Sequence, residues 1–221
     1  MYWLQTFTGK KIDLINPTSK MVDIEDIAHS LSMICRFNGH CRDFYSVAEH
    51  SVLVESIGTP VLLQFCLDPP TLAHQRLSLL LHDAAEAYIG DITTPLKRGL
   101  DSVGCDVGFV VPEGQVSKIE ALELRWLLAI GEAFGLGDWL ARPPVIVRQA
   151  DAKMFAIEVP QLFHPVQSSW WENRERPRSG EVSIQCWPPA EARRQFINRF
   201  RVLYEILQSG PGWTEIEAGR P

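Results

Sequence analysis

The sequence predicts an all-α protein, a single helical bundle preceded by a short strand or hairpin segment. Residues 46–49 (Ser-Val-Ala-Glu) and 117–120 (Ser-Lys-Ile-Glu) fit the capping box, in which a hydroxyl and a glutamate satisfy free backbone N–H groups at a helix start. Apolar residues recur at helical spacing, and glycines and prolines follow these runs. Only residues 1–20 suggest strands, in a hairpin around residues 9–10.

The expected helices follow in order along the chain. The first begins near Val47 and stops at residues 58–60 (Gly-Thr-Pro), and a short apolar piece, 61–67, comes after it. Thr71 then caps a central helix that runs to about residue 89, where Gly90 closes it. Because this helix is apolar on nearly every side, we expect it to be buried. Further helices are expected over residues 118–134, 145–158 and 190–207.

Two segments lack a helical pattern. Residues 98–115 are rich in glycine and are expected to form a loop or flap. Residues 164–189 are rich in tryptophan, proline and arginine, and either a packed surface loop or a lid or subunit contact fits them.

Composition narrows the class of protein. The 221 residues, 46% of them hydrophobic, suffice for one core, so we expect a single domain over residues 1–221. No apolar run approaches the roughly 20 residues of a membrane span, and no signal-peptide pattern opens the chain. Five cysteines without a CxxC pair indicate reduced thiols in a cytoplasmic protein. A net charge of −6 argues against long nucleic acid as a partner, but not against a single nucleotide.

Ionisable residues interrupt the apolar pattern at a few places. His82 and Asp83 lie in the predicted central helix, Asp151 lies on an apolar stripe, and His50 lies in a helix entering the same core. Each alone has an ordinary explanation, such as a hydrogen-bonded core histidine or an interhelical salt bridge. Together they would leave several buried carboxylates to be neutralised, which costs several kcal/mol without a partner. A divalent cation provides that partner, and two histidines with two aspartates form a reasonable ligand set.

These residues resemble the signature of the HD superfamily of metal-dependent phosphohydrolases: a His, a later His-Asp pair and a final Asp in an all-α fold. The local match is to bacterial 5′-deoxynucleotidases and related small deoxynucleotide hydrolases. It covers residues 30–160, and the segments that carry it are 47–51 (Val-Ala-Glu-His-Ser), 82–97 (His-Asp-Ala-Ala-Glu through Lys) and 147–152 (Val-Arg-Gln-Ala-Asp-Ala).

The resemblance implies a role for each matching position. His50, His82, Asp83 and Asp151 would bind one divalent cation, which could be Mn²⁺, Co²⁺, Fe²⁺, Zn²⁺ or Mg²⁺. Glu86 and Asp91 would be the catalytic residues: Glu86 would handle the attacking water or its proton, and Asp91 would be a second acidic residue near the phosphate and sugar, also able to take or deliver a proton. The substrate-binding residues would be Arg36 at the phosphate, Lys97 as a second phosphate contact or an exposed side chain, and Phe37, where the family has Trp, at the sugar or base.

The resemblance leaves three functions open. The first is a phosphatase of deoxynucleoside 5′-monophosphates, and the second is a triphosphohydrolase that releases triphosphate from a deoxynucleotide such as dATP. Arg98, Arg174, Arg176 and Arg178 could hold the longer phosphate tail of the second substrate. The third is a catalytically silent metal-binding or nucleotide-binding protein. The family also implies a homodimer or larger oligomer.

Overall fold

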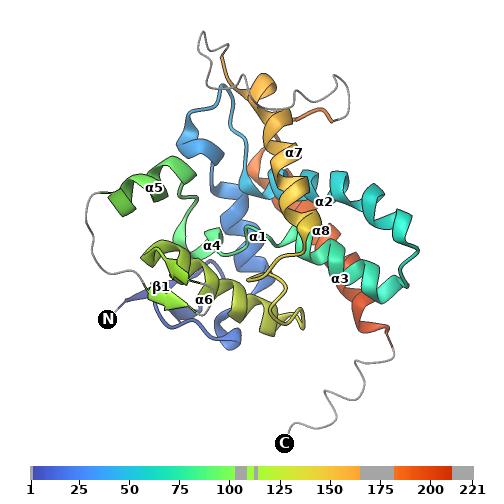
Figure 1. Cartoon of the computed structure of the whole chain (residues 1–221), viewed down its shortest axis with the longest axis horizontal. Coiled ribbons are helices and arrows are strands. Elements are labelled where there is room, and N and C mark those ends of the chain that lie inside the picture. Colours follow the sequence, from blue (N-terminus) through green and yellow to red (C-terminus); the bar gives the residue numbers. More distant parts are fainter. Residues whose placement is uncertain (1, 103–108, 112–113, 165–181, 211–221) are drawn as a thin grey trace, which may run out of the picture.

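Helices dominate the structure, which confirms the predicted all-α class (Figure 1). The computed structural model describes residues 2–102, 109–111, 114–164 and 182–210. Its helices are α1 (Ile24–Met33), α2 (Val47–Leu62), α3 (Pro69–Leu80), α4 (Glu86–Ile89), α5 (Thr94–Ser102), α6 (Lys118–Ala133), α7 (Val145–Leu162) and α8 (Pro189–Gln208). Three short 3₁₀ turns, η1 (Ser19–Met21), η2 (Arg36–Gly39) and η3 (Leu63–Phe65), connect them. None of the helices in these ranges is long and apolar enough to cross a bilayer.

Two small antiparallel hairpins accompany the helices. β1 (Trp3–Gln5) pairs with β2 (Lys11–Asp13), so the predicted N-terminal hairpin is confirmed. β3 (Phe109–Val111) pairs with β4 (Gly114–Val116) inside the segment expected to be a loop. The expectation of a loop or flap is wrong at the start of that segment, because α5 continues into it as far as Ser102. Its glycines suggested irregular backbone, but Gly99 lies in α5 and Gly114 begins β4.

The core lies between α8 and the helices that it covers. α8 packs on α1, α2 and α3, and Figure 1 shows it running behind α2 and α3. The larger apolar cluster contains fully buried Trp126 of α6 and Phe196 of α8. A smaller cluster joins α2, α3 and α7 around Val54, Leu79 and Met154. This second cluster holds together the three elements that carry the site described below.

Helix α2 continues past its predicted stop at residues 58–60. Gly58 lies against α3, where an added Cβ would come within 2.6 Å of Leu79 Cδ1. The glycine therefore allows two helices to approach closely and does not end one. Pro60 lies inside the last turn of α2, where it removes one backbone N–H donor from the helix.

The predicted central helix is in fact two helices separated by a turn. α3 starts earlier than Thr71, with Asp68 as its cap and Pro69 in its first turn, and it ends at Leu80. α4 begins at Glu86. In a continuous helix the carbonyl of Leu79 would accept the N–H four residues on, but here it lies 2.8 Å from Nδ1 of His82. The His82 side chain thus takes the place of a helical hydrogen bond.

The remaining helices agree with the sequence pattern. The capping box at Ser117 is complete, and α6 follows it to Ala133. α7 extends to Leu162, beyond the predicted end at 158, and α8 spans Pro189–Gln208, close to the predicted 190–207. Of the predicted excursion 164–189, residues 165–181 lie outside the described residues, and with them Trp170, Trp171, Arg174, Arg176 and Arg178.

Candidate metal centre

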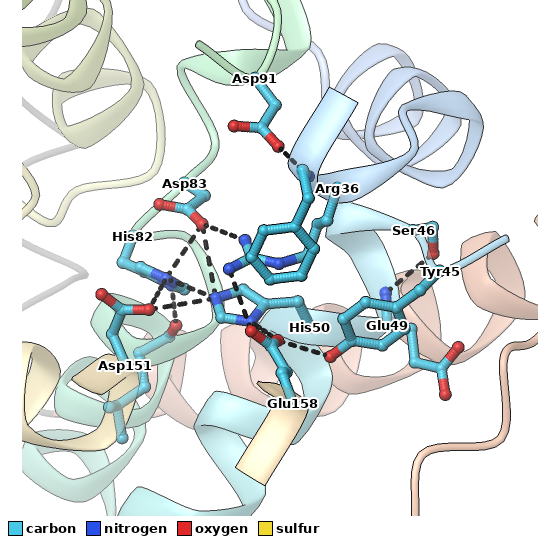
Figure 2. Close-up of polar contacts among 12 residues, drawn as sticks. Arg36, Tyr45, Ser46, Glu49, His50, His82, Asp83, Asp91, Asp151 and Glu158 are labelled. Carbon is cyan, nitrogen blue, oxygen red and sulfur yellow. Dashed lines mark hydrogen bonds and ion pairs between the residues drawn. The ribbon is translucent and has the colours of Figure 1, made fainter. Parts of the chain in front are cut away.

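Four side chains predicted as ligands meet where α2, α7 and the turn between α3 and α4 come together (Figure 2). His50 lies in the first turn of α2, whose start is held by a hydrogen bond from the Glu49 N–H to Ser46 Oγ at 3.1 Å. Asp151 comes from α7. We call His50, His82, Asp83 and Asp151 the His/Asp cluster.

The distances among His50, His82 and Asp83 suit a single cation, and Asp151 lies beside them. The two Nε2 atoms of His50 and His82 are 3.3 Å apart. Asp83 Oδ2 lies 3.5 Å and 3.2 Å from them, and Asp151 Oδ1 lies 3.3 Å and 3.9 Å from them. Two ligand atoms about 2.1 Å from one ion are separated by about 3.0 Å at a right angle and about 3.4 Å at a tetrahedral angle. His50, His82 and Asp83 each offer a ligand atom within 4.8 Å of the others, so these three could hold a metal ion.

Hydrogen bonds at the far side of each imidazole orient the ligand atoms. Nδ1 of His50 lies 2.6 Å from a carboxylate oxygen of Glu158, and Nδ1 of His82 lies 2.8 Å from the carbonyl of Leu79. A carboxylate and a carbonyl only accept, so each Nδ1 must carry the proton. In the neutral rings both Nε2 atoms then present lone pairs to each other at 3.3 Å. Such a pair needs an electrophile between them, either a proton or a metal ion, and the residues therefore fit a cation.

The histidines of the cluster are more deeply buried than the aspartates. The side chain of His50 is fully buried and that of His82 is 9% exposed, whereas Asp83 and Asp151 are 24% and 46% exposed. Asp151, predicted on an apolar stripe, places its Oδ1 atom against the two histidines, while much of its side chain faces solvent. The carboxylate side of the cluster is therefore the side that faces solvent.

Charges within the His/Asp cluster shift the titration of its members. Burial alone would raise the pKa of Asp83, but His82 and Arg36 hold it well below its ordinary value. The pKa of Asp151 is also lowered, because contacts with the two histidines outweigh its burial. Burial would lower the pKa of His82, yet Asp83 and Asp151 raise it to about 9. Without a metal, a proton therefore occupies the cluster at neutral pH.

Glu158 is a residue of the site that the sequence analysis missed. It is fully buried on α7 and accepts hydrogen bonds from His50 Nδ1 at 2.6 Å and from the Tyr45 hydroxyl at 2.9 Å. Its other oxygen lies 3.4 Å from an Arg36 nitrogen. Burial alone would raise the pKa of Glu158, but His50 and Arg36 lower it to about 2. The spacing could have revealed it, because Glu158 follows Asp151 by seven residues and so lies on the same face of a helix.

Arg36 and Phe37 reach the site from the 3₁₀ turn η2. The buried Arg36 guanidinium lies 3.4 Å from Asp83 Oδ2, and its Nε has no hydrogen-bond partner within the described part of the chain. Phe37 packs edge-on against Phe163 at a ring distance of 4.9 Å. Its backbone has φ 58°, a left-handed conformation that is costly for a bulky residue. Asp91 Oδ2 accepts the Phe37 N–H at 3.2 Å and so helps to hold this turn.

Two further predicted residues lie beside the His/Asp cluster. Burial, Asp83 and Asp91 raise the pKa of Glu86 well above its ordinary value, and its buried Oε2 has no hydrogen-bond partner among the described residues. Lys97 is paired with Glu123, and its side chain is 22% exposed. The ion pair with Glu123 contributes to a raised Lys97 pKa, although burial alone would lower it.

The capping box predicted at residues 46–49 is only half formed. Ser46 accepts the Glu49 N–H, but the Glu49 side chain turns away from the helix start. Its fully buried carboxylate instead accepts the backbone N–H groups of residues 185–187 at 2.7–3.1 Å. Glu49 thereby ties the chain before α8 to the residue next to His50.

Comparison with known proteins found no matching family model. Two relatives cover nearly the whole chain. The uncharacterized protein RCAP_rcc00048 of Rhodobacter capsulatus is 32% identical over 212 residues, which are 93% of this chain and 97% of the relative. The uncharacterized protein YfdR of Escherichia coli K12 is 34% identical over 208 residues, which are 93% of this chain and 98% of the relative.

Proposed function

The chain belongs to the family of RCAP_rcc00048 and YfdR, and we propose that it is a metal-dependent phosphohydrolase of the HD superfamily. The observation that supports this most is the pair of Nε2 atoms 3.3 Å apart, flanked by two aspartates. We further propose that its substrates are deoxynucleoside 5′-monophosphates, from which it releases phosphate. The substrate class rests on the resemblance of residues 82–97 to the 5′-deoxynucleotidases.

A divalent cation bound by the His/Asp cluster would polarise a phosphoryl oxygen and make a water more acidic. The other residues of the site have tasks that follow from their charge. Arg36 is permanently charged, and its Nε has no partner among the described residues, so it would stabilise negative charge on the phosphoryl oxygens. Asp91 would keep Arg36 in place by binding the N–H of the following residue, Phe37.

Glu86 is suited to handle a proton. Burial is the largest cause of its raised pKa, and burial persists when a cation offsets the charge of Asp83. A raised pKa favours the protonated carboxyl group, which can give its proton to the leaving sugar oxygen. General acid catalysis of this kind typically contributes about 10²–10⁴-fold to a rate.

The test is a product analysis with a panel of nucleotides. Purified protein is incubated with Mn²⁺ or Co²⁺ and each dNMP, NMP and dNTP, and the products are separated by chromatography. We expect free phosphate and a deoxynucleoside from dNMP. Triphosphate and a deoxynucleoside from dNTP would move the assignment to a triphosphohydrolase.

A Glu86→Gln variant separates catalysis from metal binding. We expect it to bind the cation as the wild type does and to lose at least about 100-fold in turnover. An unchanged rate would show that the role given to Glu86 is wrong. Metal-loaded wild-type protein that hydrolyses none of the nucleotides would contradict the proposed function and favour a silent binding protein.

A further inference from the structure

We infer that Glu158 is a positioning residue with two separate tasks, one for each carboxylate oxygen. Oε1 sets the orientation and tautomer of His50, and Oε2 holds the guanidinium of Arg36. One carboxylate thereby connects the metal ligand to the group that would bind the phosphate. The inference rests on the proposed function, since it concerns the same site.

The contacts of Oε1 leave His50 with one usable tautomer. Oε1 accepts from Nδ1 of His50 at 2.6 Å and from the Tyr45 hydroxyl at 2.9 Å. Burial and the charge of Glu158 raise the pKa of Tyr45 well above its ordinary value, so its hydroxyl remains a donor. With the proton on Nδ1, the Nε2 lone pair of His50 faces His82, Asp83 and the space where the cation would bind.

The contact of Oε2 places Arg36 between two carboxylates. Its two terminal nitrogens lie 3.4 Å from Glu158 Oε2 and 3.4 Å from Asp83 Oδ2. Both contacts are longer than a typical N–H···O hydrogen bond. The guanidinium is therefore held near the His/Asp cluster with donor capacity left for a phosphate.

A neutral amide of the same shape could not perform both tasks. In Glu158→Gln, an oxygen directed at His50 would leave the NH₂ group facing the Arg36 cation, donor against donor. The flipped amide would donate to Nδ1 of His50 and force the proton onto Nε2, where it blocks the metal. Either arrangement damages one side of the site, so the second acceptor oxygen is required.

A second buried glutamate provides a control for the loss of a buried, ion-paired carboxylate. Glu55 of α2 is also fully buried and paired with two arginines, Arg76 and Arg199. It contacts no member of the His/Asp cluster in any described interaction. Glu55→Gln therefore reproduces the loss of a buried charge without the proposed effect on the site.

The experiment compares Co²⁺ binding by calorimetry in wild-type, Glu158→Gln and Glu55→Gln proteins. We expect Glu158→Gln to weaken Co²⁺ binding or, where the amide keeps its oxygen on His50, to weaken inorganic phosphate binding to the Co²⁺-loaded protein. The expected loss is about 10–100-fold, whereas Glu55→Gln should leave both affinities at the wild-type value. Wild-type affinity for both probes in Glu158→Gln would overturn the inference. Absence of Co²⁺ binding in the wild type would instead overturn the proposed function.

A measurement on the wild-type protein covers the case in which Glu158→Gln does not fold. Long-range ¹H–¹⁵N spectra of the imidazoles distinguish the two tautomers directly. We expect His50 of the metal-free protein to carry its proton on Nδ1, where no metal on Nε2 imposes that tautomer. A proton-free Nδ1 would show that Glu158 does not set the tautomer, and the inference would be wrong.

Discussion

Cation binding should strengthen steeply as the pH rises from 7, because a proton and a cation compete for His82. In the metal-free protein Asp83 and Asp151 raise the pKa of His82 to about 9, against the effect of its burial. A cation binds only the unprotonated Nε2, and at pH 7 only about 1% of the molecules have His82 in this neutral form. Removing the proton then costs about 3 kcal/mol of binding free energy, which is about 100-fold in Kd.

The sign and the range of the effect follow from the direction of this shift. Below about pH 9, each increase of one pH unit should lower the apparent Kd about tenfold. Above about pH 9 the apparent Kd should no longer change with pH. Each cation bound near pH 7 should release about one proton. Calorimetry with Co²⁺ at several pH values between about 6.5 and 8, in buffers of different ionisation enthalpy, measures both quantities.

A distant histidine provides the control for this experiment. His74 stacks edge-on against Trp139, away from the His/Asp cluster, so His74→Gln should leave the pH dependence unchanged. A Kd that does not vary with pH in the wild type, together with no proton release, would refute the competition at His82. The same slope in a variant lacking the His82 imidazole would also contradict it.

Three further predictions concern stability, measured by urea or thermal unfolding. Glu49→Ala leaves three partly buried backbone N–H groups of residues 185–187 without their acceptor and should cost about 1–3 kcal/mol, whereas Glu49→Gln, which keeps one oxygen, should cost less; equal losses would contradict this. Gly131→Ala places a Cβ 2.0 Å from the carbonyl oxygen of Gly137 and should cost about 3 kcal/mol or more, while Gly99→Ala, with open space at its Cβ, should stabilise its helix by about 0.5–1 kcal/mol. Mn²⁺ at about 100 times its Kd should stabilise the protein by about 2.7 kcal/mol, or about 5–10 °C in Tm, and a chelator should reverse this; an unchanged Tm would argue against a cation site in the folded state.

The sequence alone predicted the features that depend on neighbouring residues. The cap at Ser117 and the start of α2 follow from side chains within about one helical turn of each other, and the N-terminal hairpin pairs residues at most ten positions apart. The sequence also predicted the residues of the His/Asp cluster, because ionisable side chains within an apolar pattern need a partner when they are buried. The structure brings these four side chains together from three separate parts of the chain.

Other features were decided only by tertiary contacts. The break after Leu80 depends on the His82 side chain binding the carbonyl of Leu79, which hydrophobic periodicity does not reveal. Glu49 fits a local capping box, yet its carboxylate binds backbone groups more than 130 residues away. Glu158 meets His50 across 108 residues. A carboxylate that is buried loses its hydrogen bonds to water and must accept hydrogen bonds from protein groups instead. The packing of the helices determines which donors lie within reach.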